Sequence, residues 1–132
     1  MHEMSIALAV IEQVEEAAER AGDITAVRSV RLQVGELAGV VPEALTFSFE
    51  LARAGTLLDG AELIAEPVPG RARCAPCDHT WAVGMPPRLS CPRCAGSRTD
   101  LLSGRELRIT EVRWDDGPAT TERTREPSFE ER

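Results

Sequence analysis

The 132-residue chain contains no lysine and no tyrosine, and its aromatic residues make up only 4% of the sequence. Its core must therefore be aliphatic, and a hydrophobic fraction of 42% is enough to fill one. No apolar run reaches about 18 residues, so no transmembrane helix is expected. The start of the chain lacks a basic segment followed by an apolar one, so no signal peptide is expected. We expect a cytoplasmic protein of one domain, or one small domain with a satellite module.

The net charge is −7, which disfavours nucleic acid as a bulk partner. The charge is unevenly distributed, because residues 71–113 carry eight Arg against four acidic residues. A local charge of +4 leaves −11 for the rest of the chain. A zinc-ribbon adaptor for nucleic acid or protein is the alternative that this basic segment supports. Only one aromatic residue, Trp81, lies between its cysteine pairs, where bases would need stacking partners.

Four cysteines form two pairs, Cys74-Ala-Pro-Cys77 and Cys91-Pro-Arg-Cys94, separated by 13 residues. In a reducing compartment such pairs indicate metal binding rather than disulfides. Each pair turns two sulfurs toward one ion, and two pairs complete a tetrahedron with Zn–S bonds of about 2.3 Å. Because protein sulfur would fill all four positions, we predict a structural zinc site, with iron as the competing ion. Metal binding would supply the folding energy of so small a module.

The chain offers little for catalysis. His79 follows Cys77 by two residues, and is either a loop histidine, a group that orients a sulfur, or a substitute ligand. No cluster of histidines and carboxylates is apparent, and a thiol-redox enzyme would need one cysteine pair without the other. We therefore expect a protein that is not an enzyme.

The first three residues, Met1-His2-Glu3, form a second set of metal ligands. The Met1 amine, the backbone nitrogen of His2 and its ring Nδ1 can form fused chelate rings. Such rings suit a planar ion, and planar coordination of this kind is typical of Ni(II) or Cu(II). The sequence therefore predicts one metal held for structure and another carried as cargo.

Hydrophobic periodicity predicts helices at 4–20 and 42–54 and strands at 26–35 and 61–67. In the first helix, residues at three- and four-residue spacing should face the core: Met4, Ala7, Leu8, Ile11, Val14 and Ala18. Pro42 suits the first position of the second helix. The fold class expected is α+β, with two helices on a small, mostly antiparallel sheet and an inserted zinc-ribbon module.

Two further features predict how the chain is divided. The prolines and glycine of 67–70 should interrupt regular structure. The apolar pattern of 107–114 slips by one residue, as in a bulged strand that returns to the first sheet. We expect a nickel-binding α/β domain of residues 1–68 and 100–114, a zinc-binding domain of 69–99, and a disordered acidic tail of 115–132. An exposed edge strand in so small a sheet leaves homodimerisation open.

Several stretches together carry a resemblance to a known family. They are Met1-His2-Glu3-Met4-Ser5-Ile6-Ala7, Val34-Gly35-Glu36-Leu37-Ala38-Gly39-Val40, Pro42-Glu43-Ala44-Leu45, the paired cysteines, and Gly104-Arg105-Glu106-Leu107-Arg108-Ile109. This combination resembles the HypA/HybF family of [NiFe] hydrogenase maturation proteins, over residues 1 to about 113.

The resemblance implies a nickel metallochaperone that acts with the GTPase HypB and serves the hydrogenase large subunit. It implies that His2, with Met1 and Glu3, binds nickel, and that Cys74, Cys77, Cys91 and Cys94 bind zinc. Some family members add a carboxylate before the second helix, but this chain has Val40 there. The residues beyond Trp114 also depart from the short ends typical of the family.

Overall fold

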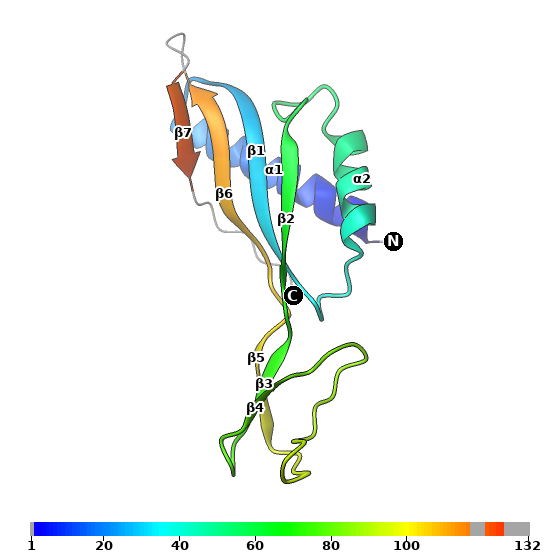
Figure 1. The fold of residues 1–132 in the computed structure, drawn as a ribbon. Coiled ribbons are helices and arrows are strands. Elements are labelled where there is room, and N and C mark those ends of the chain that lie inside the picture. Colours follow the sequence, from blue (N-terminus) through cyan, green and yellow to red (C-terminus); the bar gives the residue numbers. More distant parts are fainter. Residues whose placement is uncertain (1, 117–120, 126–132) are drawn as a thin grey trace.

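The computed structural model describes residues 2–116 and 121–125. Within them the chain forms two helices and two small sheets (Figure 1). The elements in chain order are α1 (Glu3–Ala21), β1 (Ile24–Gly35), α2 (Pro42–Ala52), β2 (Glu62–Val68), β3 (Arg71–Cys74), β4 (Thr80–Ala82), β5 (Thr99–Ser103), β6 (Leu107–Asp116) and β7 (Thr121–Arg125). The α+β class expected from the sequence is confirmed.

Helix α1 crosses one face of the larger sheet and buries an aliphatic stripe against it (Figure 1). The buried side chains are Ile6, Ala7, Val10, Ile11, Val14, Ala17 and Ala18. The expected inner face was wrong at two positions, because Met4 is 37% exposed and Leu8 is 53% exposed. Apolar residues surround most of the first two turns, so spacing alone did not decide which of them face the sheet. The buried face of α1 is therefore centred on Ile6 and Val10 instead of Met4 and Leu8.

The larger sheet has the strand order β2-β1-β6-β7, with β1 parallel to β2 and antiparallel to β6. Along β1, the side chains of Val30, Leu32 and Val34 are buried, as the alternation predicts. In β6 the register shifts between Ile109 and Glu111, so that Val112 and Trp114 stay on the buried face. The predicted bulge and the return of this strand to the first sheet are both confirmed.

Helix α2 begins with Pro42 at its first turn and packs Leu45 and Phe49 into the core. Proline suits this position because the first helical N–H groups have no partner within the helix. Strand β2 extends through Pro67 to Val68, although we expected the prolines to interrupt it. Strand β2 lies at the edge of the larger sheet, where proline is tolerated because an edge strand forms hydrogen bonds with a neighbour on one side only.

The second sheet has the strand order β4-β3-β5 and lies beyond one end of the first sheet (Figure 1). Its small core combines Ala72, Trp81 and Val83 with two of the cysteines. Strand β5 pairs with β3 as far as Ser103, so residues 100–103 pair with the smaller sheet. We propose that the chain divides into two units. The expected boundary between residues 99 and 100 then shifts to Gly104, because residues 100–103 belong to the smaller sheet.

The two sheets meet where three backbone segments lie close together. The N–H of Leu37 donates to the carbonyl of Gly104 at 2.6 Å, and the N–H of Gly70 donates to Glu36 Oε1 at 2.8 Å. A Cβ at Gly104 would lie 2.7 Å from Gly70 Cα, so this approach needs glycine. Leu37 also packs against the core of the smaller sheet. The turn after β1 therefore ties the first sheet to the second.

The expectation of disorder from residue 115 onward was wrong for two segments. Asp115 and Asp116 complete β6, and Asp115 is buried and paired with Arg28. Residues 121–125 form β7, which pairs with β6 from Val112 onward. Polar strands carry no hydrophobic period, which is why composition suggested disorder. The rest of that expectation, on 117–120 and 126–132, lies outside the described residues.

Candidate metal sites

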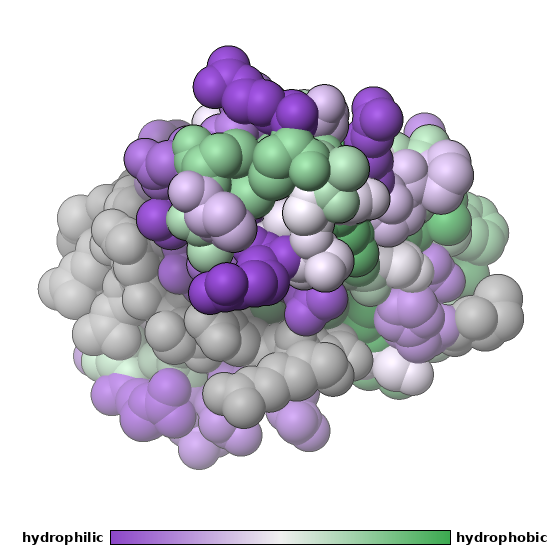
Figure 2. All heavy atoms as spheres, turned by 90° about the horizontal axis from the view of Figure 1, so that it is seen from below, coloured by the Kyte–Doolittle hydropathy of each residue, from purple (hydrophilic) through white to green (hydrophobic). Residues whose placement is uncertain are grey.

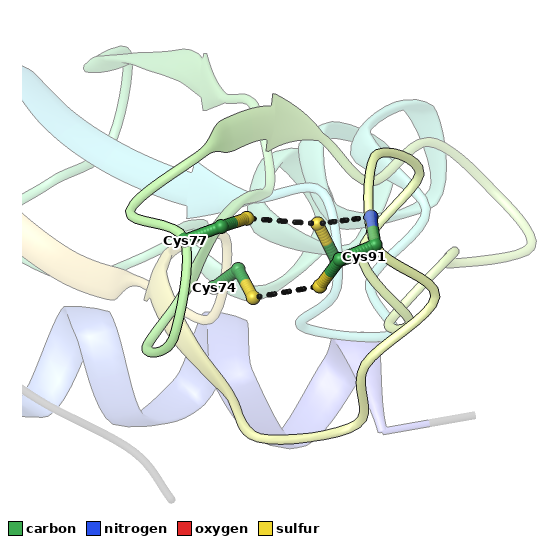
Figure 3. A group of neighbouring side chains, drawn as sticks. Cys74, Cys77 and Cys91 are labelled. Carbon is green, nitrogen blue, oxygen red and sulfur yellow. Dashed lines mark hydrogen bonds between the residues drawn. The ribbon is translucent and has the colours of Figure 1, made fainter.

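The four cysteine sulfurs converge on one point at the end of β3, where Cys74 ends the strand and the other three cysteines lie in turns or loops (Figure 3). All four Sγ atoms lie within 4.8 Å of one another. Cys74 Sγ and Cys94 Sγ are 3.5 Å apart. Cys77 Sγ and Cys91 Sγ are 3.6 Å apart. Zn–S bonds of about 2.3 Å would separate the sulfurs of a tetrahedron by about 3.8 Å, so the donor set and its spacing fit zinc.

Each cysteine pair is held by an equivalent set of backbone hydrogen bonds. In the first, the N–H of Asp78 donates to the carbonyl of Cys74, whose own N–H donates to His79. In the second, Ala95 and Gly96 take the corresponding places around Cys91. Asp78 and Ala95 both have φ of 61°, the left-handed conformation that reverses the chain after each pair. Two equivalent turns therefore present two sulfurs each to a shared centre.

Backbone amides also point at the sulfurs. The N–H groups of Arg93 and Cys94 donate to Cys91 Sγ at 3.4 and 3.5 Å. Burial raises the pKa of the Cys91 thiol, but these two amides and the neighbouring sulfurs outweigh it and lower the pKa to about 7. The N–H of Cys77 lowers the pKa of Cys74, but burial and the adjacent thiols raise it to about 12. Cysteine ligands must lose their protons to bind a metal ion, and the two amides that donate to Cys91 Sγ favour its thiolate form.

The cluster is packed on one side, while Cys94 is exposed. A Cβ at Gly96 would lie 3.2 Å from Cys94 Sγ, so this turn is closely packed against the sulfurs. His79 is not grouped with the four sulfurs, and instead stacks on Trp81 with ring centroids 5.9 Å apart. The indole of Trp81 donates to the carbonyl of Arg88 at 2.7 Å. These contacts pack the loop between the cysteine pairs against β4.

At the other predicted site, His2 lies at the surface immediately before α1 and serves as its N-cap residue. Its carbonyl accepts the N–H of Ile6 at 2.9 Å, so the residue is fixed to the first turn of the helix. The backbone nitrogens at the start of a helix have no partner within it. The main chain of His2 is therefore held in place while its imidazole is exposed. Met1 lies outside the described residues.

Glu3, the other predicted nickel ligand, is the first residue of α1 and is only 8% exposed. Its Oε2 accepts a hydrogen bond from the N–H of Val41 at 3.0 Å. This hydrogen bond is the largest of the effects that lower the pKa of the Glu3 carboxyl. Val41 is the N-cap residue of α2. Glu3 therefore joins the starts of the two helices, a role that sequence reasoning did not identify.

Residues 36–41 connect the start of α1 to the smaller sheet. At one end the N–H of Val41 donates to Glu3, and at the other Leu37 packs against the small core that contains Trp81 and Val83. Nothing in the sequence except the resemblance of Val34–Val40 to the family motif signalled this connection. The side chain of Val40, in the same segment, packs against the main core.

Comparison with known proteins identifies similar chains. Residues 1–114 match the family model described as "Hydrogenase/urease nickel incorporation, metallochaperone, hypA". The chain is 72% identical to the hydrogenase maturation factor HypA of Streptomyces avermitilis over 132 residues, which is the full length of both. It is 43% identical to the HypA of Desulfosudis oleivorans over 112 residues, which cover 85% of this chain and 96% of that one.

Among solved structures, the solution structure of the Ni metallochaperone HypA from Helicobacter pylori matches with a TM-score of 0.60. The match covers 85% of this chain and 96% of that chain, at 22% sequence identity. A second solution structure of a HypA protein matches with a TM-score of 0.57 at 23% identity. These two structures support the fold. None of the described helices is long and apolar enough to cross a membrane.

Proposed function

Because the chain belongs to the HypA family of hydrogenase and urease nickel-incorporation metallochaperones, we propose that it binds Ni(II) at its N-terminus and delivers it for assembly of the [NiFe] hydrogenase active site. The observation that carries this proposal is the exposed His2, which is fixed by its own carbonyl at the start of α1. Its ring and main-chain nitrogens, with the Met1 amine, form the proposed ligand set. Glu3, at the adjacent position, would add only Oε1 of its buried carboxylate, because Oε2 accepts the N–H of Val41.

The position of this site suits a carrier. Exposed ligands at a chain end exchange quickly, so nickel can pass to a recipient by stepwise ligand substitution. Copper would bind such nitrogens more tightly, so selectivity must come from metal availability and from the partner. The proposed partners are the GTPase HypB and the hydrogenase large subunit, and the proposed location is the cytoplasm. No contact with nucleic acid is proposed, and a homodimer remains an alternative assembly.

Zinc is the proposed resident metal of the four cysteines. The spacing of the sulfurs and their amide donors support a closed tetrahedral site, in which no coordination position is left for a substrate. Zinc there would hold together the three short strands of the smaller sheet. The role of this ion is structural in the proposal, and nickel is the cargo.

A strain that lacks this chain tests the delivery. We expect its hydrogenase activity to be restored by the wild-type chain and not by His2→Ala, with both proteins present at equal levels. Excess nickel in the medium should restore activity with His2→Ala, because delivery is then less limiting. Equal activity with wild type and His2→Ala at low nickel would contradict the proposal.

A further inference from the structure

A groove runs between α2 and β2 and ends at the junction of the two sheets. One hollow of about 620 Å³ lies at its lower end, and Val34, Val40, Pro42, Ala65 and Val68 supply its apolar lining. A second hollow of about 450 Å³ shares Pro42 and Ala65 with the first and continues along α2. In Figure 1, α2 stands beside β2, with the chain that enters the helix at its base. Among the described residues, β2 has a strand neighbour on one side only, so it forms an edge of the larger sheet beside this groove.

The side of α2 next to this groove exposes large apolar side chains. Phe47, which lines the second hollow, is 62% exposed, and Leu51, one turn later, is 57% exposed. By contrast Phe49, two residues from Phe47, is 1% exposed. Figure 2 shows hydrophobic surface on the side of the molecule that carries α2, bordered by hydrophilic residues. Exposed apolar surface of this kind, with a polar border, marks an interaction site.

The charges around the groove are negative. Glu43 and Glu50 flank Phe47 at four and three residues, so all three side chains share one side of the helix. Both glutamates are exposed, and neither forms an ion pair with another described residue. Glu36 lies at the opposite end of the groove. An apolar floor with acidic borders is complementary to apolar side chains that stand next to arginine or lysine.

The groove also lies next to the start of α1. Val40 and Pro42 line it, and the residue between them, Val41, is hydrogen-bonded to Glu3. A molecule in the groove would therefore contact the segment around Val41, which is hydrogen-bonded to Glu3. Glu3 directly follows His2 in the chain. This part of the argument rests on the proposed function, since it takes His2 as the nickel ligand.

We propose that the groove between α2 and β2 binds a segment of a maturation partner in which apolar side chains are flanked by arginine or lysine. Phe47 provides the main apolar contact, and Glu43 and Glu50 select for positive charge. Docking here brings the recipient of nickel next to the N-terminal ligands. The acidic borders exclude partners whose apolar segments carry negative charge.

Two full-length proteins from the same genome serve as probes, the HypB-type GTPase and the hydrogenase large-subunit precursor. Their affinity for the full chain is measured by calorimetry at about 50 and 300 mM NaCl, with Phe47→Glu and Glu43→Arg/Glu50→Arg as variants. The control is Leu102→Glu, which makes the same change at a side chain that is 54% exposed in β5. Circular dichroism confirms that each variant folds, which we expect because the changed side chains are at the surface.

We expect at least one probe to bind ten-fold or more weakly to both groove variants, while the control matches wild type. Binding of that probe to wild type should weaken with salt, and the arginine variant should lose this dependence. The proposal is overturned if neither probe binds, if the groove variants bind both probes as wild type does, or if the arginine variant binds more tightly. It is also overturned if sedimentation shows a wild-type dimer that Phe47→Glu dissociates, since a second copy would then occupy the groove.

Nickel binding by the same proteins separates this proposal from the proposed function. Both groove variants should bind nickel as wild type does, because the N-terminal ligands are unchanged. A wild-type chain that binds its partner through the groove but binds no nickel would refute the cargo function and leave the docking site standing.

Discussion

The carboxylate of Glu3 and the backbone N–H of Val41 are joined by a hydrogen bond of 3.0 Å, although they are separated by 38 residues in the chain. This contact connects the first residue of α1 to the N-cap residue of α2. From Val41 the chain leads back through Leu37, which packs against the core that includes two of the cysteines. The proposed N-terminal ligands and the cysteine cluster are thus linked by one short segment, residues 36–41.

Replacing Glu3 tests whether this contact holds the segment. Glu3→Ala removes the acceptor of the Val41 N–H and should lower the melting temperature by several degrees. Glu3→Gln keeps an acceptor of the same shape and should retain most of that stability. Glu12→Ala, on the exposed side of α1, is the matched control and should melt like wild type. If Glu3→Ala melts like the control, the hydrogen bond does not stabilise the fold.

Acid should weaken the same contact. The pKa of Glu3 is lowered in the folded chain, chiefly by the Val41 N–H. A carboxyl whose folded pKa lies below its unfolded value contributes stability above the unfolded pKa, and this is lost as the pH falls through the folded pKa. The stability difference between wild type and Glu3→Gln should therefore shrink below about pH 4.5. Urea unfolding at pH 7 and pH 3.5 measures it, and a difference that grows with acid would contradict the assignment.

The glycine junction between the sheets should tolerate no side chain. A Cβ at Gly104 would approach Gly70 Cα to 2.7 Å, and its φ of 120° already disfavours other residues. Gly104→Ala should cost about 2–4 kcal/mol of unfolding free energy, from backbone strain and overpacking together. Gly39→Ala is the control, because Gly39 also has positive φ but no atom within 4 Å of the added Cβ. It should cost about 1 kcal/mol, and equal costs in urea unfolding would refute the packing argument.

Zinc removal should unfold one part of the chain and leave the other. The smaller sheet buries only a few side chains, so its order should depend on the metal, whereas the larger core does not include the cysteines. After chelation, or in Cys91→Ser, amides of β3 and β4 should exchange rapidly with deuterium while those of α1 and β1 stay protected. Loss of protection throughout the chain would show instead that the two sheets fold as one unit.

Nickel and zinc should respond differently to acid. Amino groups and imidazoles bind protons near neutral pH, so protons compete directly with nickel at the proposed N-terminal site. We expect nickel to be released as the pH is lowered from 7.5 to 6 while zinc is retained. Metal analysis after dialysis at each pH measures both. Release of zinc before nickel would contradict the assignment of the two metals to the two ligand sets.

Much of this architecture could be predicted because it depends on local patterns. The alternation of Val30, Leu32 and Val34 defines a half-buried strand, and the slipped pattern before Trp114 defines a bulge. The spacing of the two cysteine pairs predicted that their sulfurs meet at one site, because each pair forms its turn from only a few neighbouring residues. The chelate-forming residues at the N-terminus predicted a second metal site, and the resemblance to the family then added the proposed partners and the proposed delivery role.

The features that could not be predicted depend on contacts between distant residues. The hydrogen bond between the Val41 N–H and the Glu3 carboxylate, and the approach of Gly104 to Gly70, each involve a backbone atom of a distant residue, which leaves no periodic trace in the sequence. The inner face of α1 was misassigned at Leu8 because apolar residues there surround the helix. Strand β7 is polar, so only its pairing with β6 identifies it as a strand.

Nickel binding by the untagged chain tests the central claim most directly. Three proteins are compared by calorimetry and total metal analysis: wild type beginning at Met1, a form with several residues added before Met1, and His2→Ala. We predict that wild type binds one Ni(II) in addition to its zinc, and that both altered forms lose the nickel and keep the zinc. Equal nickel binding by all three proteins would contradict the account, because the cargo ligands would then lie elsewhere in the chain.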